Sequence, residues 1–173
     1  AERIAIKSDP VLKNLREFVV RLSKIDHNAL EVVFMADSNV FDGRFANNGW
    51  LQEIPDPVTK LMWDNAASMS PKTARQLGVS SNDLVRLTLG KNNLDIPVWV
   101  QPGHADGSVS LTLGYGREHS GRVGNSVGFD TYKLRTSGNI NFAGGLKVSS
   151  TGKIIELACS QDNHSMEGRP LIR

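Results

Sequence analysis

The amino-acid sequence predicts a mainly-β domain folded as a closed barrel, and three features lead to this prediction. Short segments with alternating apolar and polar residues recur along the chain, as in residues 95–101 and 108–113, and this period of two is typical of strands with one buried face. Turn-forming segments such as PGHADG (residues 102–107) separate them. A single short, capped helix is expected between two of these strands. Short strands at this spacing favour a closed barrel over an open parallel sheet.

About eight short strands are expected. They are residues 30–36, 60–65, 82–89, 95–101, 108–113, 129–135, 146–150 and 153–159, the last two forming a hairpin around Thr151 and Gly152. Serine caps helices and proline suits their first position, so Ser70 and Pro71 predict the start of the capped helix, and Gly78 predicts its end. One further helical turn is expected at residues 48–54.

A longer helix is expected near the N-terminus, after an extended lead-in at residues 1–7. Asp9 predicts its cap and Pro10 its first position. One apolar stripe follows, formed by Val11, Leu12, Leu15, Phe18, Val19 and Leu22. We expect this helix to pack on the outside of the barrel or to belong to a preceding domain. The sequence therefore divides into a leading helix at 1–28, a β-barrel at 29–160 and a tail at 161–173.

The composition excludes several classes of protein. The formal net charge is +2, with no acidic or basic block and few aromatic residues, which argues against a nucleic-acid-binding arm or a base-stacking surface. No apolar run reaches the roughly 18 residues of a membrane-spanning helix. Cys159 is the single cysteine, so an internal disulfide or a cysteine-ligated iron–sulfur cluster within this chain is excluded. Its place in a predicted strand indicates a buried, inert thiol.

A glycine-rich segment follows the strand at 108–113. Five glycines, at positions 114, 116, 121, 124 and 128, are interspersed with Arg117 and Arg122. Glycine lets the backbone approach a ligand closely, and arginine binds phosphate oxygens with two nitrogens. The segment is consistent with either a phosphate-facing role or a plain surface loop. Its spacing matches neither a nicotinamide-dinucleotide fingerprint nor a P-loop.

No catalytic constellation is found in the sequence. The histidines, at positions 27, 104, 119 and 164, do not have zinc-ligand spacing, and no nucleophile elbow or acid–base pair is found. What remains is a set of polar residues on loops at strand ends: Asn47, Asn48, Asp64, Asn65, Tyr115, Arg117, Arg122 and Asn125. Such residues suit recognition of a large polar ligand and equally suit a protein interface.

Three segments resemble a known domain family. SPKTARQLGVSSNDLVRLTLG, PVWVQPGHADGSVSLTLGYGR and GRVGNSVGF are similar to the C-terminal molybdopterin-dinucleotide-binding domain of molybdopterin oxidoreductases, which implies a double-psi β-barrel. More narrowly, FDGRFANNGWLQEIPDPVTKLMWDN, GHADGSVSLTLGYGR and CSQDNHSMEGRPLIR resemble the molybdopterin-oxidoreductase-like subunit of alternative complex III, a bacterial quinol-oxidising membrane assembly. The resemblance covers roughly residues 10–173.

The resemblance implies that this chain is one domain of a fused polypeptide. A ferredoxin-like portion with iron–sulfur clusters would follow the tail, and the other domains and the complex's other subunits would be the partners, on the periplasmic side of the membrane. Neither nucleic-acid binding nor direct membrane insertion is implied. The family's molybdoenzyme-like portion is thought to have lost its molybdenum cofactor, so no cofactor is expected in the isolated domain. Molybdopterin guanine dinucleotide stays possible by resemblance.

Motif position also implies candidate cofactor contacts. They are Asp64, Asn65, Tyr115, Arg117, Gly124 and Asn125. The first hypothesis is a structural and interaction domain of an electron-transfer oxidoreductase subunit, with no catalytic centre of its own and a vestigial site. The alternative is a true molybdopterin guanine dinucleotide-binding domain of an active molybdenum enzyme. A hydrolase or decarboxylase on the same barrel ranks last, because no nucleophile or self-processing site is identified.

Overall fold

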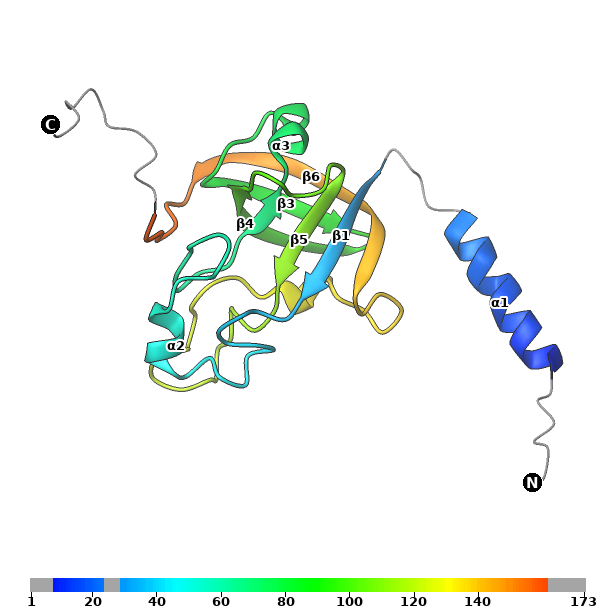
Figure 1. Ribbon diagram of the computed structural model, residues 1–173, viewed down its shortest axis with the longest axis horizontal. Helices are drawn as coiled ribbons and strands as arrows, with labels where there is room; N and C mark the ends of the chain where they lie inside the picture. The colour runs from blue at the N-terminus through cyan, green and yellow to red at the C-terminus, as the bar shows by residue number, and fades with distance from the viewer. Residues whose placement is uncertain (1–7, 24–28, 162–173) are drawn as a thin grey trace, which may run out of the picture.

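The computed structural model describes residues 8–23 and 29–161. Its main body is a closed barrel of six strands in the order β1-β5-β2-β4-β3-β6 (Figure 1). The strands are β1 Leu30–Met35, β2 Ala67–Met69, β3 Asp83–Leu89, β4 Asn92–Val100, β5 Ser108–Thr112 and β6 Phe142–Ile154. The helices are α1 Ser8–Ser23, α2 Gly49–Glu53, α3 Pro71–Leu77 and the 3-10 helix η1 Thr131–Leu134. The predicted mainly-β barrel with a few short helices is confirmed.

Two parallel pairs give the barrel its topology. β1 runs parallel to β5, and β2 runs parallel to β4, while β2 and β5 join the two pairs in antiparallel register. β3 and β6 complete the wall with antiparallel pairings. Parallel neighbours cannot be joined by a tight turn, so the connections between them are long, and those connections carry the polar loops described below.

The barrel interior is filled by the alternating apolar residues that the sequence indicates. Val85, Leu87, Val98, Val109 and Leu111 are all fully buried in one cluster, and Val100 packs against it. These side chains come from β3, β4 and β5, so three walls of the barrel share one core. The predicted face assignment of these strands is confirmed.

Helix α3 begins and ends where the sequence predicts. The Ser70 hydroxyl accepts a hydrogen bond from the Thr73 backbone N–H at 3.1 Å, and Pro71 occupies the first turn. Gly78 ends the helix with φ of 67°, the left-handed conformation that glycine adopts without strain. The predicted helical turn in 48–54 is likewise present as α2.

The prediction of a strand at residues 60–65 is wrong. Lys60 and Trp63 both have positive φ, at 63° and 66°, and an extended strand excludes that conformation. The strand in this region is β2, which pairs with β4 and β5 through only three residues. Three residues are too few to show a period of two, so the sequence pattern did not indicate it.

Residues 129–135 form no strand either. The segment turns into η1, because the Asp130 side chain caps it by accepting a hydrogen bond from the Tyr132 N–H at 3.1 Å. Thr131 and Leu134 are fully buried. The spacing of these two buried residues is therefore that of one face of a short helix rather than of a strand.

The predicted hairpin around Thr151 and Gly152 is wrong, because β6 runs through this position as one strand. Its first half pairs with β1 and its second half with β3. Leu84 pairs with Lys153 while Val85 pairs with Ser150, so Thr151 and Gly152 form a bulge. Gly152 has φ of 72°. Cys159 lies beyond this strand and is half-buried, so its predicted place in a strand is also wrong.

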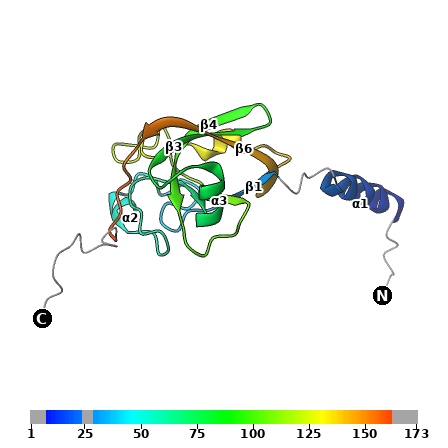
Figure 2. The same cartoon turned by 90° about the horizontal axis from the view of Figure 1, so that it is seen from above.

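Helix α1 begins at Ser8, so Asp9 lies in its first turn rather than before it. Every residue from 9 to 17 is exposed, including Val11, Leu12 and Leu15 of the predicted stripe, and Figures 1 and 2 show α1 to one side of the barrel. Packing on the barrel is therefore not observed for these residues, and membership of a preceding domain stays a prediction. No helix in residues 8–23 and 29–161 has the length and hydropathy to span a membrane. The lead-in at 1–7 and the tail from 162 lie outside the described residues.

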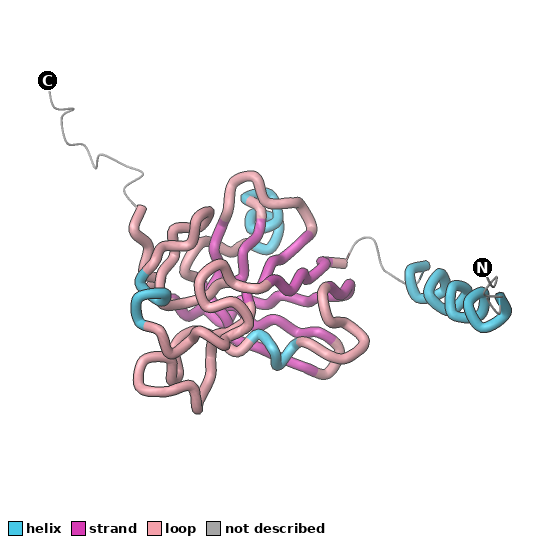
Figure 3. Tube along the Cα trace, turned by 60° about the horizontal axis from the view of Figure 1, so that its bottom comes forward, coloured by secondary structure: helices cyan, strands magenta, loops and turns pink. Residues whose placement is uncertain are grey.

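The long loops gather at one end of the barrel. β1 and β5 are parallel neighbours, so the segments that follow them leave from the same end, and the segment before β2 reaches that end because β2 is antiparallel to β5. Figure 3 shows these loops beside the strands, with α2 among them. We call this region the loop end; it comprises residues 36–66 and 113–130. It contains all the residues predicted from motif position to contact a cofactor.

Leu111 tests the barrel assignment. Replacement of this fully buried side chain by alanine should lower the free energy of unfolding by about 2–5 kcal/mol, because a cavity remains in the core. Ile154→Ala is the matched control, since Ile154 is 74% exposed on β6 and should change stability by less than about 0.5 kcal/mol. Chemical denaturation of both variants measures this, and equal losses would contradict the assignment.

Candidate functional site

Asn65 joins three segments at the loop end. Its side-chain amide nitrogen donates to the backbone oxygens of Thr112 and Phe129, at 3.1 and 3.0 Å, and its side-chain oxygen accepts from the Phe129 N–H at 2.7 Å. Asn65 is only 3% exposed. Its amide is therefore engaged with the protein itself and holds the end of β5 and residue 129 against the entry to β2.

The glycine-rich segment folds back on itself between these anchors. The Gly116 N–H donates to the Val127 oxygen and the Ser126 N–H donates to the Arg117 oxygen, both at 2.7 Å. At the tip, the Asn125 side-chain oxygen accepts from the N–H groups of Ser120 and Gly121, at 2.7 and 3.0 Å. Asn125 is exposed, but its oxygen closes the loop.

The neighbouring loop after β1 holds this tip. The Asn47 side-chain oxygen accepts from the Val123 N–H at 3.0 Å. Asn48 caps α2, its side-chain oxygen accepting from the Trp50 N–H at 3.1 Å. The sequence left Asn47, Asn48, Asn65 and Asn125 open between ligand recognition and protein contacts. In the structure the side-chain oxygen of each accepts hydrogen bonds from the chain's own backbone.

The glycines of the segment are needed for contact between the two loops. A Cβ on Gly114 would lie 2.6 Å from the backbone nitrogen of Gly43, and one on Gly124 would lie 2.5 Å from the Ala46 oxygen. A Cβ on Gly116 would collide with the Asp130 backbone. These distances leave no room for a side chain. Glycine is therefore required here because another part of the protein backbone lies against it.

The arginines of the loop end remain at the surface. Arg117 and Arg122 are both exposed, and the Arg117 guanidinium makes one long contact, 3.5 Å, to the Asp42 backbone oxygen. Arg44 forms a two-point ion pair with Asp42, with N–O distances of 2.9 and 2.8 Å. This pairing lowers the pKa of Asp42 to about 2. The free cationic charge of the glycine-rich segment therefore faces solvent.

A cavity of about 350 Å³ opens at the loop end beside β1, β2 and β5. Asp64 and Tyr115, predicted from motif position, line it together with Asp37, Asp56 and His104. His104 is held by its Nε2 at 2.8 Å from the Ser110 hydroxyl. His104 and His119 line different cavities, and no group of three metal-ligating side chains occurs among the described residues.

The carboxyl groups of this cavity differ in environment. Burial raises the pKa of Asp37 and of Asp64 above the usual value, although backbone N–H groups oppose the shift in both cases. Burial acts in the same direction on Asp56, but four hydrogen bonds from Ser38, Val58 and Thr59 outweigh it and lower the pKa. Burial also raises the pKa of Tyr115, and the neighbouring Asp37 adds to the shift. Tyr115 is therefore a neutral donor to Asp37.

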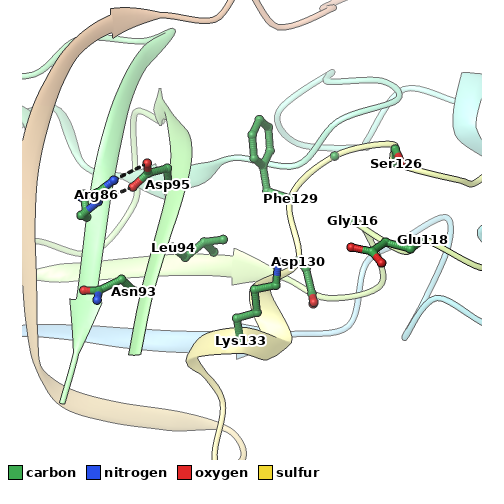
Figure 4. Close-up of a pocket in the computed structure, with 11 residues that line it drawn as sticks. Arg86, Asn93, Leu94, Asp95, Gly116, Glu118, Ser126, Phe129, Asp130 and Lys133 are labelled. Atoms are coloured by element: carbon green, nitrogen blue, oxygen red, sulfur yellow. Dashed lines mark hydrogen bonds and ion pairs between the residues drawn. The ribbon is translucent and has the colours of Figure 1, made fainter. Parts of the chain in front are cut away.

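A second, more open pocket lies between the barrel wall and the glycine-rich segment (Figure 4). Arg86 and Asp95 lie on the strand side, joined by two hydrogen bonds of 2.7 and 2.8 Å. Glu118 and Ser126 lie on the opposite side in the view. The basic side chains that line this pocket are Arg86 and Lys133. Arg86 pairs with Asp95, whereas the acidic residues Asp130 and Glu118 offset the charge of Lys133 within the pocket.

Comparison with known proteins identifies the family. The family model described as Molydopterin dinucleotide binding domain matches residues 44–144, which is more than half of the 173-residue chain. The chain belongs to the molybdopterin dinucleotide-binding domain family. The double-psi β-barrel expected from the resemblance agrees with this membership and with the closed six-strand barrel.

Among solved structures, acetylene hydratase from Pelobacter acetylenicus is similar to this chain, with 17% sequence identity and a TM-score of 0.49. The match covers 76% of this chain and 19% of the hydratase, so the chain spans about a fifth of that protein. No curated protein sequence matches.

The structure brings the six residues predicted from motif position to one end of the barrel, but it divides them. Asp64, Asn65 and Tyr115 line the cavity, and Asn65 also joins two segments of the loop end. Gly124 and Asn125 connect loops and do not line it. Arg117 lies at the surface. Asp37 and Asp56 also line the cavity and were not predicted from the sequence. Asp37 lies two residues after the end of β1, and polar residues gather at such strand ends in parallel sheets. A role of these residues in cofactor binding stays a prediction.

The cavity does not suit the diphosphate of the family's cofactor. Three aspartates line it, and no lysine or arginine does so among the described residues. Phosphate sites in proteins are formed by arginine, lysine and free backbone N–H groups. Here the backbone N–H groups of Gly116, Gly121, Val123, Ser126 and Phe129 already donate to protein oxygens.

Glycine substitutions test whether the segment packs on protein. Gly114→Ala should lower the free energy of unfolding by more than about 3 kcal/mol, because positive φ adds to the collision with Gly43. Gly103→Ala is the matched control, with φ of 86° and open space around its Cβ, and should cost only about 1–2 kcal/mol. Thermal and chemical unfolding measure both, and a Gly114→Ala variant as stable as the control would contradict the packing role.

Proposed function

We propose that this chain is a structural domain of a molybdopterin-oxidoreductase-like subunit of the alternative complex III type, and that its cofactor site is vestigial. One observation carries this proposal: amide groups at the loop end that could bind a dinucleotide bind the protein itself. The Asn65 amide makes three hydrogen bonds within the chain, and the N–H groups of Gly116, Gly121, Val123 and Ser126 also donate to protein oxygens.

In this proposal the domain supplies surface and rigidity, and electron transfer takes place elsewhere. The iron–sulfur clusters belong to a downstream portion of the fused polypeptide, and the partners are the other domains and the other subunits of a quinol-oxidising membrane complex. The assembly is proposed to lie on the periplasmic side of the bacterial inner membrane. Large apolar side chains at the loop end, among them Phe45, Trp50 and Val58, are exposed, and the proposal assigns them to contacts with these partners.

The alternative is a true molybdopterin guanine dinucleotide-binding domain of an active molybdenum enzyme. The family membership and the two exposed arginines, Arg117 and Arg122, favour it. In that case neighbouring domains would complete the site, because a site divided between domains loses contacts and preorganisation when one part is isolated.

Metal analysis of the full-length protein distinguishes the two functions. The polypeptide that contains this chain should be purified from its native membranes, with a molybdenum enzyme of the same domain family prepared in parallel as a recovery control. The proposal predicts iron without molybdenum, in a complex that oxidises quinol. Molybdenum at one atom per polypeptide would contradict the proposal that the cofactor site is vestigial and would favour the alternative. A protein isolated free of membrane subunits would contradict the assignment to a membrane complex.

A further inference from the structure

The cavity of the loop end has a charge opposite to the one that the family's cofactor requires. Asp37, Asp56 and Asp64 line it, on three different segments that meet where β1 ends and β2 begins. Asp37 is only 7% exposed, and its oxygen accepts from the N–H groups of Asn39 and Val40, each at 2.8 Å. The Asp37 carboxyl group is therefore fixed in the fold by these backbone hydrogen bonds.

Three cationic side chains of the loop end are directed to other partners. The Lys60 ammonium donates to the Pro57 backbone oxygen at 3.0 Å, Arg44 pairs with Asp42, and Arg117 lies against the Asp42 backbone. None of the three lines the cavity. His104 is the one lining residue in the described part of the chain that could carry a positive charge, and its ring nitrogens already contact Ser110 and Ala105.

Neither the ionised nor the protonated form of the carboxyl groups favours phosphate binding. Ionised, each carboxylate repels a phosphate, with an energy that grows as solvent is excluded. Protonated, Asp37 or Asp64 supplies no positive charge to offset the dianion. Asp56 accepts hydrogen bonds from two N–H groups and two hydroxyls, which favours its ionised form. At least one negative charge therefore remains in the cavity.

We infer that the cavity formed by Asp37, Asp56 and Asp64 excludes phosphate-bearing ligands, so that the dinucleotide site is closed by local charge and not merely by missing neighbouring domains. This inference rests on the proposed vestigial site and gives it a physical cause. The ligand class that it rejects is nucleotide phosphates, whereas a neutral nucleoside meets no such barrier.

Charge-neutralising variants of the 173-residue chain test the inference. Asp56→Asn with Asp64→Asn removes two carboxylates and keeps an acceptor oxygen at each position. Glu17→Gln with Glu31→Gln is the matched control, because it changes the net charge equally at two exposed positions outside the cavity. Titration with GMP and with guanosine, followed by amide chemical shifts of Ser68 and Ser110 at physiological salt, measures binding at the cavity.

We expect GMP to bind the aspartate variant about tenfold more tightly than the wild type, because close carboxylates are poorly screened at this salt. The control should stay within about twofold, since charges beyond about 8 Å are largely screened. Guanosine affinity should not change in either variant. If the double variant unfolds, Asp64→Asn alone, at a half-buried position, should give about threefold tighter GMP binding.

Two results would overturn the inference: GMP affinity of the aspartate variant no greater than that of the control, or wild-type GMP affinity equal to guanosine affinity. Either result would leave the proposed structural function standing, because a site can be vestigial for other reasons. The proposed function itself fails only through molybdenum or missing partners in the full-length protein, so the two failures are distinguishable.

Discussion

The arrangement of the loop end depends on the hydrogen bonds of Asn65. This one buried amide holds the end of β5, through the Thr112 oxygen, and both backbone groups of Phe129. The glycine-rich segment leaves β5 and returns at Phe129, so its two ends are fixed at one point. Loss of these hydrogen bonds would leave buried polar groups without partners, and each such group costs about 1–3 kcal/mol of folding free energy. The fold of the segment is therefore coupled to the identity of residue 65.

The residue types at the loop end are those that ligand sites use, and the structure shows them in a different role. Asparagine, glycine and backbone N–H groups can recognise phosphates, but here they join the loop after β1 to the loop after β5. The remaining cavity is acidic. In the proposed function the barrel preserves the family's fold, while cofactor binding depends on a few groups of the loops.

Sequence patterns predicted the barrel and missed the places where one residue controls the backbone. Val85, Leu87, Val109 and Leu111 alternate clearly, and their burial follows from that period. Positive φ at Lys60 and Trp63, the Asp130 cap and the bulge at Gly152 are features of single residues that a period of two cannot report. The six residues predicted from motif position lie at one end of the barrel, but motif position has a limit. It could not tell a ligand contact from a contact between loops, because both use the same hydrogen-bonding groups.

Hydrogen exchange at Phe129 and Gly116 tests most directly whether the protein alone orders the glycine-rich segment. Their N–H groups donate to the Asn65 side chain and to the Val127 oxygen. The account predicts that both amides are protected without ligand, that added GMP does not change their rates, and that Asn65→Ala exposes both while amides of β3 stay protected. Amides that exchange freely in the wild type, or that become protected only when GMP is added, would contradict it.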